Sequence, residues 1–361
     1  MDIDYNEDIE SEFLKFREDL RGFPSNKNYV EIYTGFKEKF DKEIHPEVKT
    51  KILEIEKEGY YNDHGVDHIK MVIQRVSWLL DNLDVTFSKD DDAGNKFFIS
   101  PYELFILLVA IQLHDTGHLI ASREDHAKKG AELLTKFDSG RILSSGERQT
   151  ISNIAKAHGG KEDPIGKLAY KDDISHKTIR PQFLAALLRL GDELAEDQTR
   201  ASNFLLEIDQ IVPTSKIYHL YSASLQSVKI NGGELKLKFF ISDKVLVEKY
   251  KVKIKREIKE VFLLDEVYKR TFKTFTESLY CSRFLPEKCR INSVKVEINL
   301  FNSSDDQNFK CLAYELKDSL YPTVGKGCIF SMNESLIEDG KHLNGECISK
   351  LVTKMKNYES V

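Results

Sequence analysis

The chain has 361 residues, more than a single hydrophobic core usually supports, so we expect two domains or one domain with a large extension. Apolar residues make up 41% of the sequence and charged residues 31%, which excludes a disordered or fibrous protein. The formal charge of −6 gives no global attraction to nucleic acid, no apolar run reaches the roughly 18 residues of a membrane span, and the N-terminus is acidic. We therefore predict a cytoplasmic protein without a membrane partner, compatible with a monomer or a homo-oligomer.

Helical patterns fill the first part of the chain. Apolar residues recur every three to four positions over residues 66–82, which predicts an amphipathic helix. Ser100-Pro101 then supplies an N-cap and a proline at the first helical position. The helix that follows, YELFILLVAIQL, is apolar nearly all round and ends in His114-Asp115. Such a helix is expected at the centre of a helical bundle.

Three further helices carry polar residues near their ends or on their apolar faces. Ser122 and Asp125 resemble a capping box that opens a helix over residues 126–137. The next helix ends in AHGG, where one of the two glycines can adopt the left-handed conformation that closes a helix, so His158 lies at its C-terminus. The last helix, PQFLAALLRLGDELAED, has Asp192 where its apolar face continues.

Strand patterns appear after about residue 211. The turn Asn231-Gly232-Gly233 precedes the alternating segment GELKLKFFIS, which predicts a pair of strands. We expect a long charged helix over about 247–280, a strand over 294–300 and a helix near 309–320. The predicted fold class is mainly α, a helical bundle with a C-terminal α+β region. The predicted boundaries are a helical extension at 1–44, a helical domain at 45–210 and the α+β region of unknown role at 211–361.

All five cysteines lie in the last quarter of the chain, and they show neither CxxC nor close histidine spacing. This pattern favours buried, reduced thiols over a zinc site or disulfides. The cysteines are Cys281, Cys289, Cys311, Cys328 and Cys347.

Histidines cluster in the helical part of the chain, most of them near predicted helix ends. A metal ion that activates water needs several converging imidazole or carboxylate ligands and an open coordination position. Asp115 and Asp192 end or interrupt apolar helix faces, where a negative charge is costly unless a cation compensates it. The alternative is that Asp115 caps a helix and that Asp192 pairs with Arg189 or Arg200. The clustered histidines are His64, His68, His114, His118, His126, His158 and His176.

The order of these residues resembles the HD superfamily of metal-dependent phosphohydrolases over about residues 45–204. HGVDHIKMV matches the helix of the first histidine, LHDTGH the signature His-Asp pair, and LLRLGDEL the late aspartate. The resemblance implies a mostly helical HD domain with a primary metal site. The residues it implies for that site are His68, His114, Asp115 and Asp192.

In superfamily members with two metals, additional histidines come from the helices between the His-Asp pair and the late aspartate. The corresponding positions here are His126 and His158, which makes a second metal site one option. In one-metal nucleotide triphosphohydrolases of the superfamily, such histidines bind phosphate or donate protons instead. His118, within HDTGH, also suits proton transfer. Asp115, His118 and His126 are therefore our candidate catalytic residues.

Two residues are candidate substrate contacts. His64 precedes His68 by four positions, so both rings share a face if the helix extends that far. Arg200 resembles an arginine that follows the late aspartate in exopolyphosphatase-like and bacterial conflict-system HD domains, where it could bind phosphate through two hydrogen bonds. That branch often has an aspartate three residues after the metal-binding one, where this chain has Ala195.

A metal in such a site lowers the pKa of bound water toward about 7 and polarises the phosphoryl oxygen. The mixed imidazole and carboxylate set suits Mn, Fe, Co, Ni or Zn better than Mg, which remains an option. The leading hypothesis is a phosphohydrolase whose small-molecule substrate is a nucleotide, above all a (deoxy)nucleoside triphosphate. The alternatives are a two-metal phosphodiesterase or nuclease acting on a cyclic or oligonucleotide, a nucleotide-sensing module without turnover, and a metal-free helical scaffold.

Overall fold

The computed structural model describes residues 8–56, 65–81, 86–87, 98–122, 125–201, 206, 208–209, 211–254, 257–317 and 329–359. The chain forms two compact units. The first comprises Met1–Ile52, Asp63–Ala195 and Tyr280–Arg290, and the second comprises Leu53–Asn62, Glu196–Leu279 and Ile291–Val361. The fold is mainly α, with a helical bundle and a C-terminal region that contains a mixed sheet, as predicted. Among the described residues, no helix has both the length and the apolar character needed to cross a bilayer.

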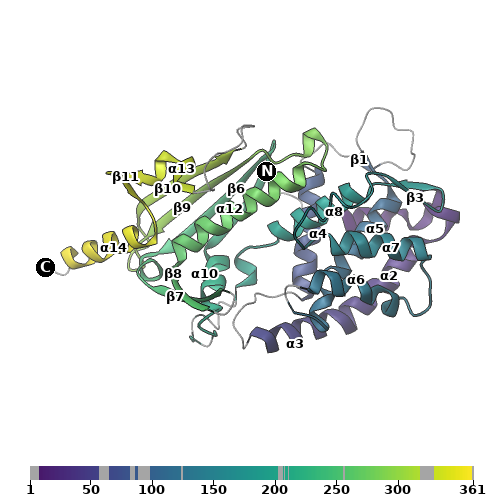
Figure 1. Ribbon diagram of the computed structural model, residues 1–361, viewed down its shortest axis with the longest axis horizontal. Helices are drawn as coiled ribbons and strands as arrows, with labels where there is room; N and C mark the ends of the chain where they lie inside the picture. The colour runs from purple at the N-terminus through teal and green to yellow at the C-terminus, as the bar shows by residue number, and fades with distance from the viewer. Residues whose placement is uncertain are drawn as a thin grey trace. The chain divides into compact units, whose positions relative to one another are not determined.

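The first unit is built around α5 (Pro101–Leu113), whose residues are all buried. Ser100 and Glu103 form the predicted capping box at its start. The helices that contact α5 include α1 (Ile9–Leu14), α2 (Tyr29–Lys39), α4 (Val66–Asp81), α7 (Ser145–Lys156) and α8 (Pro181–Leu194) (Figure 1). Further elements include η5 (Thr116–Leu119), α6 (His126–Phe137), the hairpin of β3 (Asp172–Ile174) and β4 (Lys177–Ile179), and the short pair β1 (Thr86–Phe87) and β2 (Phe98–Ile99). Helix α3 (His45–Glu56) belongs to this unit as far as Ile52.

Buried carboxylates fix the starts of helices in this unit. Glu103 of α5 accepts hydrogen bonds from the main-chain nitrogen of Arg180 at 3.0 Å and from its Nε and Nη2 at 2.8 Å. Arg180 is the N-cap of α8, so this pair sets the start of α8 against α5. Glu147, in the first turn of α7, sets the start of that helix against α2 and α5, because its carboxylate accepts hydrogen bonds from the hydroxyls of Tyr29 at 2.5 Å and Tyr102 at 3.0 Å. These contacts satisfy the buried polar groups.

The second unit contains a four-stranded sheet in the order β10-β9-β6-β5. Strands β5 (Leu225–Asn231) and β6 (Glu234–Ser242) form the predicted hairpin, in which Gly232 and Gly233 have φ of 56° and 80°. Strand β6 pairs in parallel with β9 (Ser293–Phe301), the predicted 294–300 strand, and β9 pairs antiparallel with β10 (Asn308–Lys317). Other elements of this unit include α10 (Lys216–Ser224), α11 (Asp243–Leu246), α13 (Ile329–Met332), α14 (Gly345–Glu359) and the hairpin of β11 (Ile337–Glu338) and β12 (Lys341–His342).

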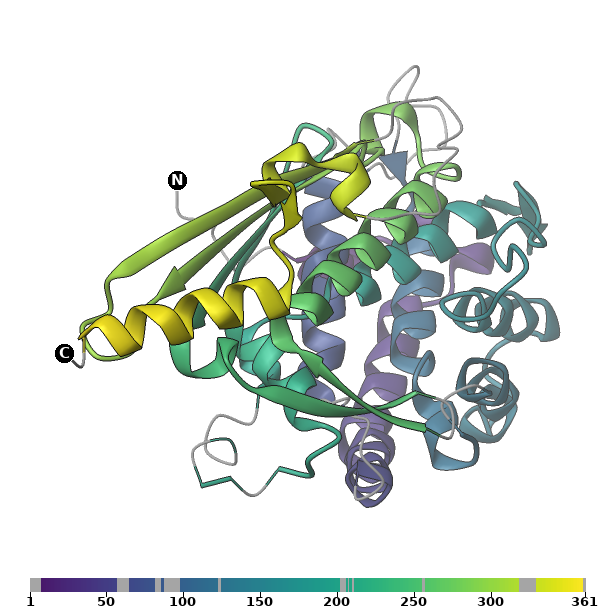
Figure 2. The same ribbon diagram turned by 60° about the vertical axis from the view of Figure 1, so that its left-hand side comes forward.

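Two helix predictions for the second unit are wrong. We expected a helix over 247–280, but this segment begins with two antiparallel strands, β7 (Lys249–Ile254) and β8 (Glu257–Phe262), which are separate from the main sheet. Helix α12 (Leu263–Ser282) follows these strands (Figure 2). Along β7 the buried Tyr250 and Val252 alternate with lysines, which is the period of two expected of a strand. We predicted a charged helix here instead. The predicted helix at 309–320 is strand β10, whose buried residues are Leu312, Tyr314 and Leu316.

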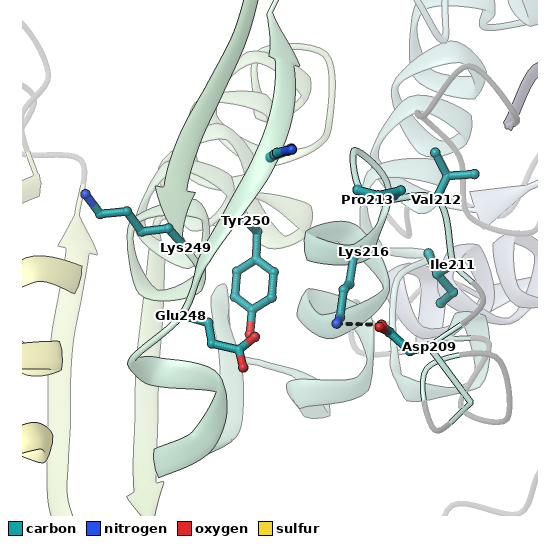
Figure 3. A pocket seen from close by; sticks show the side chains of 9 residues that line it. Asp209, Ile211, Val212, Pro213, Lys216, Glu248, Lys249 and Tyr250 are labelled. Carbon is teal, nitrogen blue, oxygen red and sulfur yellow. Dashed lines mark hydrogen bonds and ion pairs between the residues drawn. The ribbon is translucent and has the colours of Figure 1, made fainter.

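A cavity of about 490 Å³ lies in the second unit between β7 and the segment that leads into α10. Three of its charged side chains have partners, since Lys216 lies 2.8 Å from Asp209 and Glu248 lies beside the Tyr250 hydroxyl (Figure 3). The side chain of Lys249, on the opposite face of the strand from Tyr250, points away from this space. We therefore assign no ligand to this cavity.

The cysteine prediction is partly wrong. Cys281 and Cys289 are buried free thiols, as expected, and burial raises the pKa of Cys289 to about 11. Cys311, however, is exposed because it lies on the outer face of β10, and Cys347 is partly exposed. Cys328 lies outside the described residues.

Candidate metal centre

The ends of three helices bring one set of donors together. His68 lies in the first turn of α4, His114 is the C-cap of α5 and Asp192 lies in the last turn of α8. Asp192 Oδ1 is 3.2 Å from His68 Nε2 and 3.7 Å from His114 Nε2. The donor atoms of these three residues, which we call triad A, all lie within 4.8 Å of one another.

A second set lies on the other side of Asp115. His126 is the first residue of α6, and His158 follows α7. Their Nε2 atoms lie 3.0 Å apart, and 3.4 Å and 3.8 Å respectively from Asp115 Oδ1. We call Asp115, His126 and His158 triad B; its donor atoms also lie within 4.8 Å of one another.

Asp115 connects the two triads through its two carboxylate oxygens. Oδ2 lies 3.4 Å from His68 Nε2 and 3.3 Å from His114 Nε2, whereas Oδ1 faces His126 and His158. Each oxygen therefore faces a different group of imidazole nitrogens. This is the arrangement expected of a carboxylate that bridges two cations.

The donor set fits a metal ion in both spacing and chemistry. Two ligands bound to one ion at about 2.1 Å lie roughly 3.0–3.4 Å apart in octahedral or tetrahedral geometry, close to the observed separations. His114 Nδ1 donates to the Ile111 carbonyl at 2.7 Å, and His158 Nδ1 donates to the Ala155 carbonyl at 2.5 Å. These hydrogen bonds leave both Nε2 lone pairs directed inward. His114 Nε2 is buried and makes no hydrogen bond to any described residue.

Electrostatics show that the centre stabilises positive charge. Burial lowers the pKa of His114, but the carboxylates of Asp115 and Asp192 outweigh burial and raise it well above its usual value. Burial opposes ionisation of Asp192, yet His114 and His68 hold its pKa well below the usual range. At His158, burial and the nearby His114 and His126 lower the pKa to about 3, so its ring is neutral and available as a ligand.

The donors of the centre differ in their exposure to solvent. The side chains of Asp192 and His126 are 29% and 17% exposed, whereas that of Asp115 is 8% exposed and that of His114 is fully buried. His118 stacks on the His126 ring, with centroids 4.2 Å apart, and its Nε2 lies 3.8 Å from Asp115 Oδ1. Asp192 and His126 are therefore the most exposed donors of the centre.

Glycines permit the close helix approaches that assemble the centre. A Cβ at Gly117, within HDTGH, would lie 1.8 Å from the carbonyl oxygen of His126 and 2.6 Å from the amide nitrogen of Gly130. Only glycine therefore lets α6 pack against η5 with His126 next to Asp115. At Gly191, a Cβ would lie 2.5 Å from Cγ2 of Val76, so glycine also lets α8 approach α4.

The helices predicted around the site are present, although α8 ends at Leu194 rather than at Asp197. Helix α6 covers residues 126–137 as predicted, but the capping box expected from Ser122 and Asp125 does not form. The box requires Asp125 to be the third residue of the helix, whereas α6 begins at His126 and Asp125 is itself the N-cap. Gly160, with φ of 90°, has the predicted left-handed conformation after α7.

The structure places most of the predicted site residues together. His68, His114, Asp115, His118, His126, His158 and Asp192 share one centre. His64 lies outside the described residues, and Arg200 belongs to the second unit, where it lies 3.6 Å from Glu196. The described contacts favour the metal-site interpretation of Asp192 over its pairing with arginine, since Asp192 lies beside His68 and His114 and the contacts of Arg189 include the carbonyls of Ala157 and Gly159. The contact of Arg189 with these carbonyls could not be predicted from sequence, because it depends on the conformation of the loop around His158.

Comparison with known proteins gives one match. A sequence profile of the HD-CE family matches residues 58–243, whereas no curated protein and no solved structure matches the chain. The matched segment contains every member of triads A and B. Because it covers more than half of the 361 residues, the chain belongs to the HD-CE family, whose HD-type domain indicates metal-dependent phosphohydrolase chemistry.

Proposed function

We propose that this chain is a two-metal phosphohydrolase that cleaves a phosphodiester bond in a cyclic or oligonucleotide. The observation that supports this function is the orientation of Asp115, whose two oxygens face triad A and the histidines of triad B. A one-metal enzyme needs only the first of these donor sets. The second set therefore favours the two-metal alternative over a one-metal (deoxy)nucleoside triphosphohydrolase.

In this proposal, triad A together with Asp115 would hold one divalent ion, and triad B would hold the other. Bound ions of this kind lower the pKa of water toward about 7 and polarise the phosphoryl oxygen. The chain itself orients the ligands, because the Ile111 and Ala155 carbonyls fix the imidazole rings of His114 and His158. The four imidazoles favour Mn, Fe, Co, Ni or Zn over Mg.

His118 is the proposed proton donor or acceptor at the substrate oxygen. Of the two histidines in HDTGH, His114 belongs to triad A, whereas His118 belongs to neither triad. The His118 ring is nearly parallel to that of His126, with an interplanar angle of 9°. A histidine can exchange a proton near neutral pH. The more exposed Asp192 and His126 lie on the side from which the substrate would approach.

A count of bound metal tests the proposal. The wild-type protein is expected to bind two equivalents of Mn²⁺ per chain and to release nucleoside monophosphates from cyclic nucleotides or short single-stranded oligonucleotides. His158→Asn is expected to bind one equivalent and to lose roughly a hundredfold or more in kcat, because asparagine is too short to bring its amide to the position of the imidazole Nε2. Elemental analysis and chromatography of the products give both readouts.

His176→Asn is the matched control. His176 is exposed in the turn between β3 and β4 with φ of 65°, a conformation that asparagine tolerates, so this variant should keep both metals and full activity. Binding of one equivalent by the wild type, with triphosphate release from deoxynucleoside triphosphates, would support the one-metal alternative instead. Nucleotide binding without metal-dependent turnover of any substrate would support the sensing module.

A further inference from the structure

The loop that follows His158 has an unfavourable backbone conformation. After α7 ends at Lys156, Gly160 has φ of 90°, and the non-glycine residues Glu162 and Asp163 have φ of 64° and 58°. Residues with side chains rarely adopt this left-handed region, so such a loop persists only where surrounding contacts hold it. The loop matters for the centre because His158 lies at its start.

Arg189 holds the first part of this loop. Its Nη1 donates to the carbonyl oxygens of Ala157 at 3.4 Å and Gly159 at 3.2 Å, the two residues that flank His158. Arg189 lies on α8 almost one turn before Asp192, so the same helix carries a ligand of triad A and a contact to the loop of triad B. Its guanidinium also lies 5.0 Å from the centre of the Tyr280 ring, a cation–π contact.

Tyr280 holds the second part of the loop. Its hydroxyl accepts a hydrogen bond from the Ile165 amide at 2.9 Å and donates one to Asp163 Oδ1 at 3.0 Å. The second hydrogen bond, together with the Gly166 amide and Arg283, lowers the pKa of Asp163. Arg283 Nη2 lies 3.5 Å from Asp163 Oδ2 in an exposed pair that adds little. The hydroxyl thus joins two positions of this loop, Asp163 and Ile165.

The segment Tyr280–Arg290 belongs to the first unit although the preceding part of α12, Leu263–Leu279, belongs to the second. Tyr280 follows Leu279 within one continuous helix. The loop after His158 is therefore completed by a segment that lies far beyond the HD helices in the chain and outside the matched HD-CE residues.

We infer that Arg189 and Tyr280 are positioning residues for His158, so that metal occupancy of triad B depends on the segment Tyr280–Arg290. This inference rests on the proposed two-metal function. A metal site tolerates ligand displacements of only about 0.2 Å, so a loop that relaxes by a fraction of an ångström withdraws the His158 Nε2 from triad B. Triad A contains no residue of this loop and is unaffected by its relaxation.

Tyr280→Phe tests the inference in the full-length chain. Phenylalanine keeps the ring beside Arg189 and removes both hydrogen bonds of the hydroxyl. In the metal-free protein, amide hydrogen exchange over residues 158–166 is expected to accelerate about tenfold. In Mn²⁺ titrations against a competing chelator, the affinity of the second equivalent should fall about 10- to 100-fold, as when other groups that orient ligands are removed, while the first equivalent binds as in the wild type.

Tyr268→Phe is the control on the same helix. The Tyr268 hydroxyl donates to the Leu343 carbonyl at 2.9 Å within the second unit, so this variant also loses a tyrosine hydrogen bond of α12 but does not touch the loop. It should change neither the exchange of residues 158–166 nor the affinity for the second Mn²⁺. Arg189→Met should reproduce the effect of Tyr280→Phe, and Arg189→Lys should restore part of the affinity because lysine can still donate to one carbonyl.

The inference is overturned if Tyr280→Phe matches Tyr268→Phe in both readouts. It is also overturned if both Mn²⁺ equivalents weaken equally, because that would indicate a general structural defect. A wild-type protein that binds one Mn²⁺ contradicts the two-metal function, but loop exchange in the metal-free variants still shows whether Tyr280 holds the loop. The two failures are therefore distinguishable.

Discussion

Replacing Asp115 with asparagine is expected to remove both metal ions and to lower kcat/KM at least about a thousandfold, equivalent to about 4 kcal/mol of transition-state stabilisation. Asparagine has nearly the same volume, but it replaces one carboxylate oxygen with an amide that donates hydrogen bonds. Whichever way the amide turns, its NH2 group presents hydrogen atoms to one of the two groups of imidazole nitrogens. The substitution also removes the negative charge of the carboxylate that both metal positions would share. Elemental analysis and steady-state kinetics measure the two effects.

Two comparisons show whether the effect is specific to the bridging position. Asp192→Asn changes a member of triad A only, so it should lower the metal content to about one equivalent rather than none. Asp172→Asn, on the exposed strand β3, should leave both metals in place. Wild-type metal content in Asp115→Asn would rule out the assignment of Asp115 as the bridging ligand.

The helices around the metal centre were predictable from sequence because each has a clear apolar pattern. For α5, a Ser-Pro start and an apolar body predicted a buried helix, and the structure has it with a complete capping box. The acids at the ends of apolar faces, Asp115 and Asp192, indicated a buried cation site because an isolated carboxylate is unstable there. The structure places both acids beside imidazole nitrogens.

Other features depend on contacts that no local pattern reports. Nothing near Tyr280 in the sequence indicates that its hydroxyl reaches Asp163 and Ile165, because the contact joins segments separated by most of the second unit. The ribbon of β7 and β8 was misread for a local reason. Its outward residues are lysines and glutamates, which are also typical of solvated helices, and only the buried positions Tyr250 and Val252 show the strand period.

Gly117→Ala is expected to destabilise the protein by about 3 kcal/mol or more and to release metal from triad B. The added Cβ would meet the His126 carbonyl at 1.8 Å and the Gly130 amide at 2.6 Å, and both are backbone atoms that cannot rotate away. The first turn of α6 must therefore shift, and His126 moves with it. Urea unfolding gives the free energy of unfolding, and Mn²⁺ titration gives the affinity of the second equivalent.

The same substitution at Gly35 provides the control because the two glycines differ only in their surroundings. Gly35 lies exposed within α2, and no atom lies within 4 Å of a Cβ placed there. Alanine at this position is expected to stabilise the protein by about 0.5–1 kcal/mol, since it lowers the entropy lost when the helix forms. Opposite signs for one chemical change would show that the glycine of HDTGH is required for the approach of α6. A Gly117→Ala variant as stable as Gly35→Ala, with both metals bound, would contradict that role.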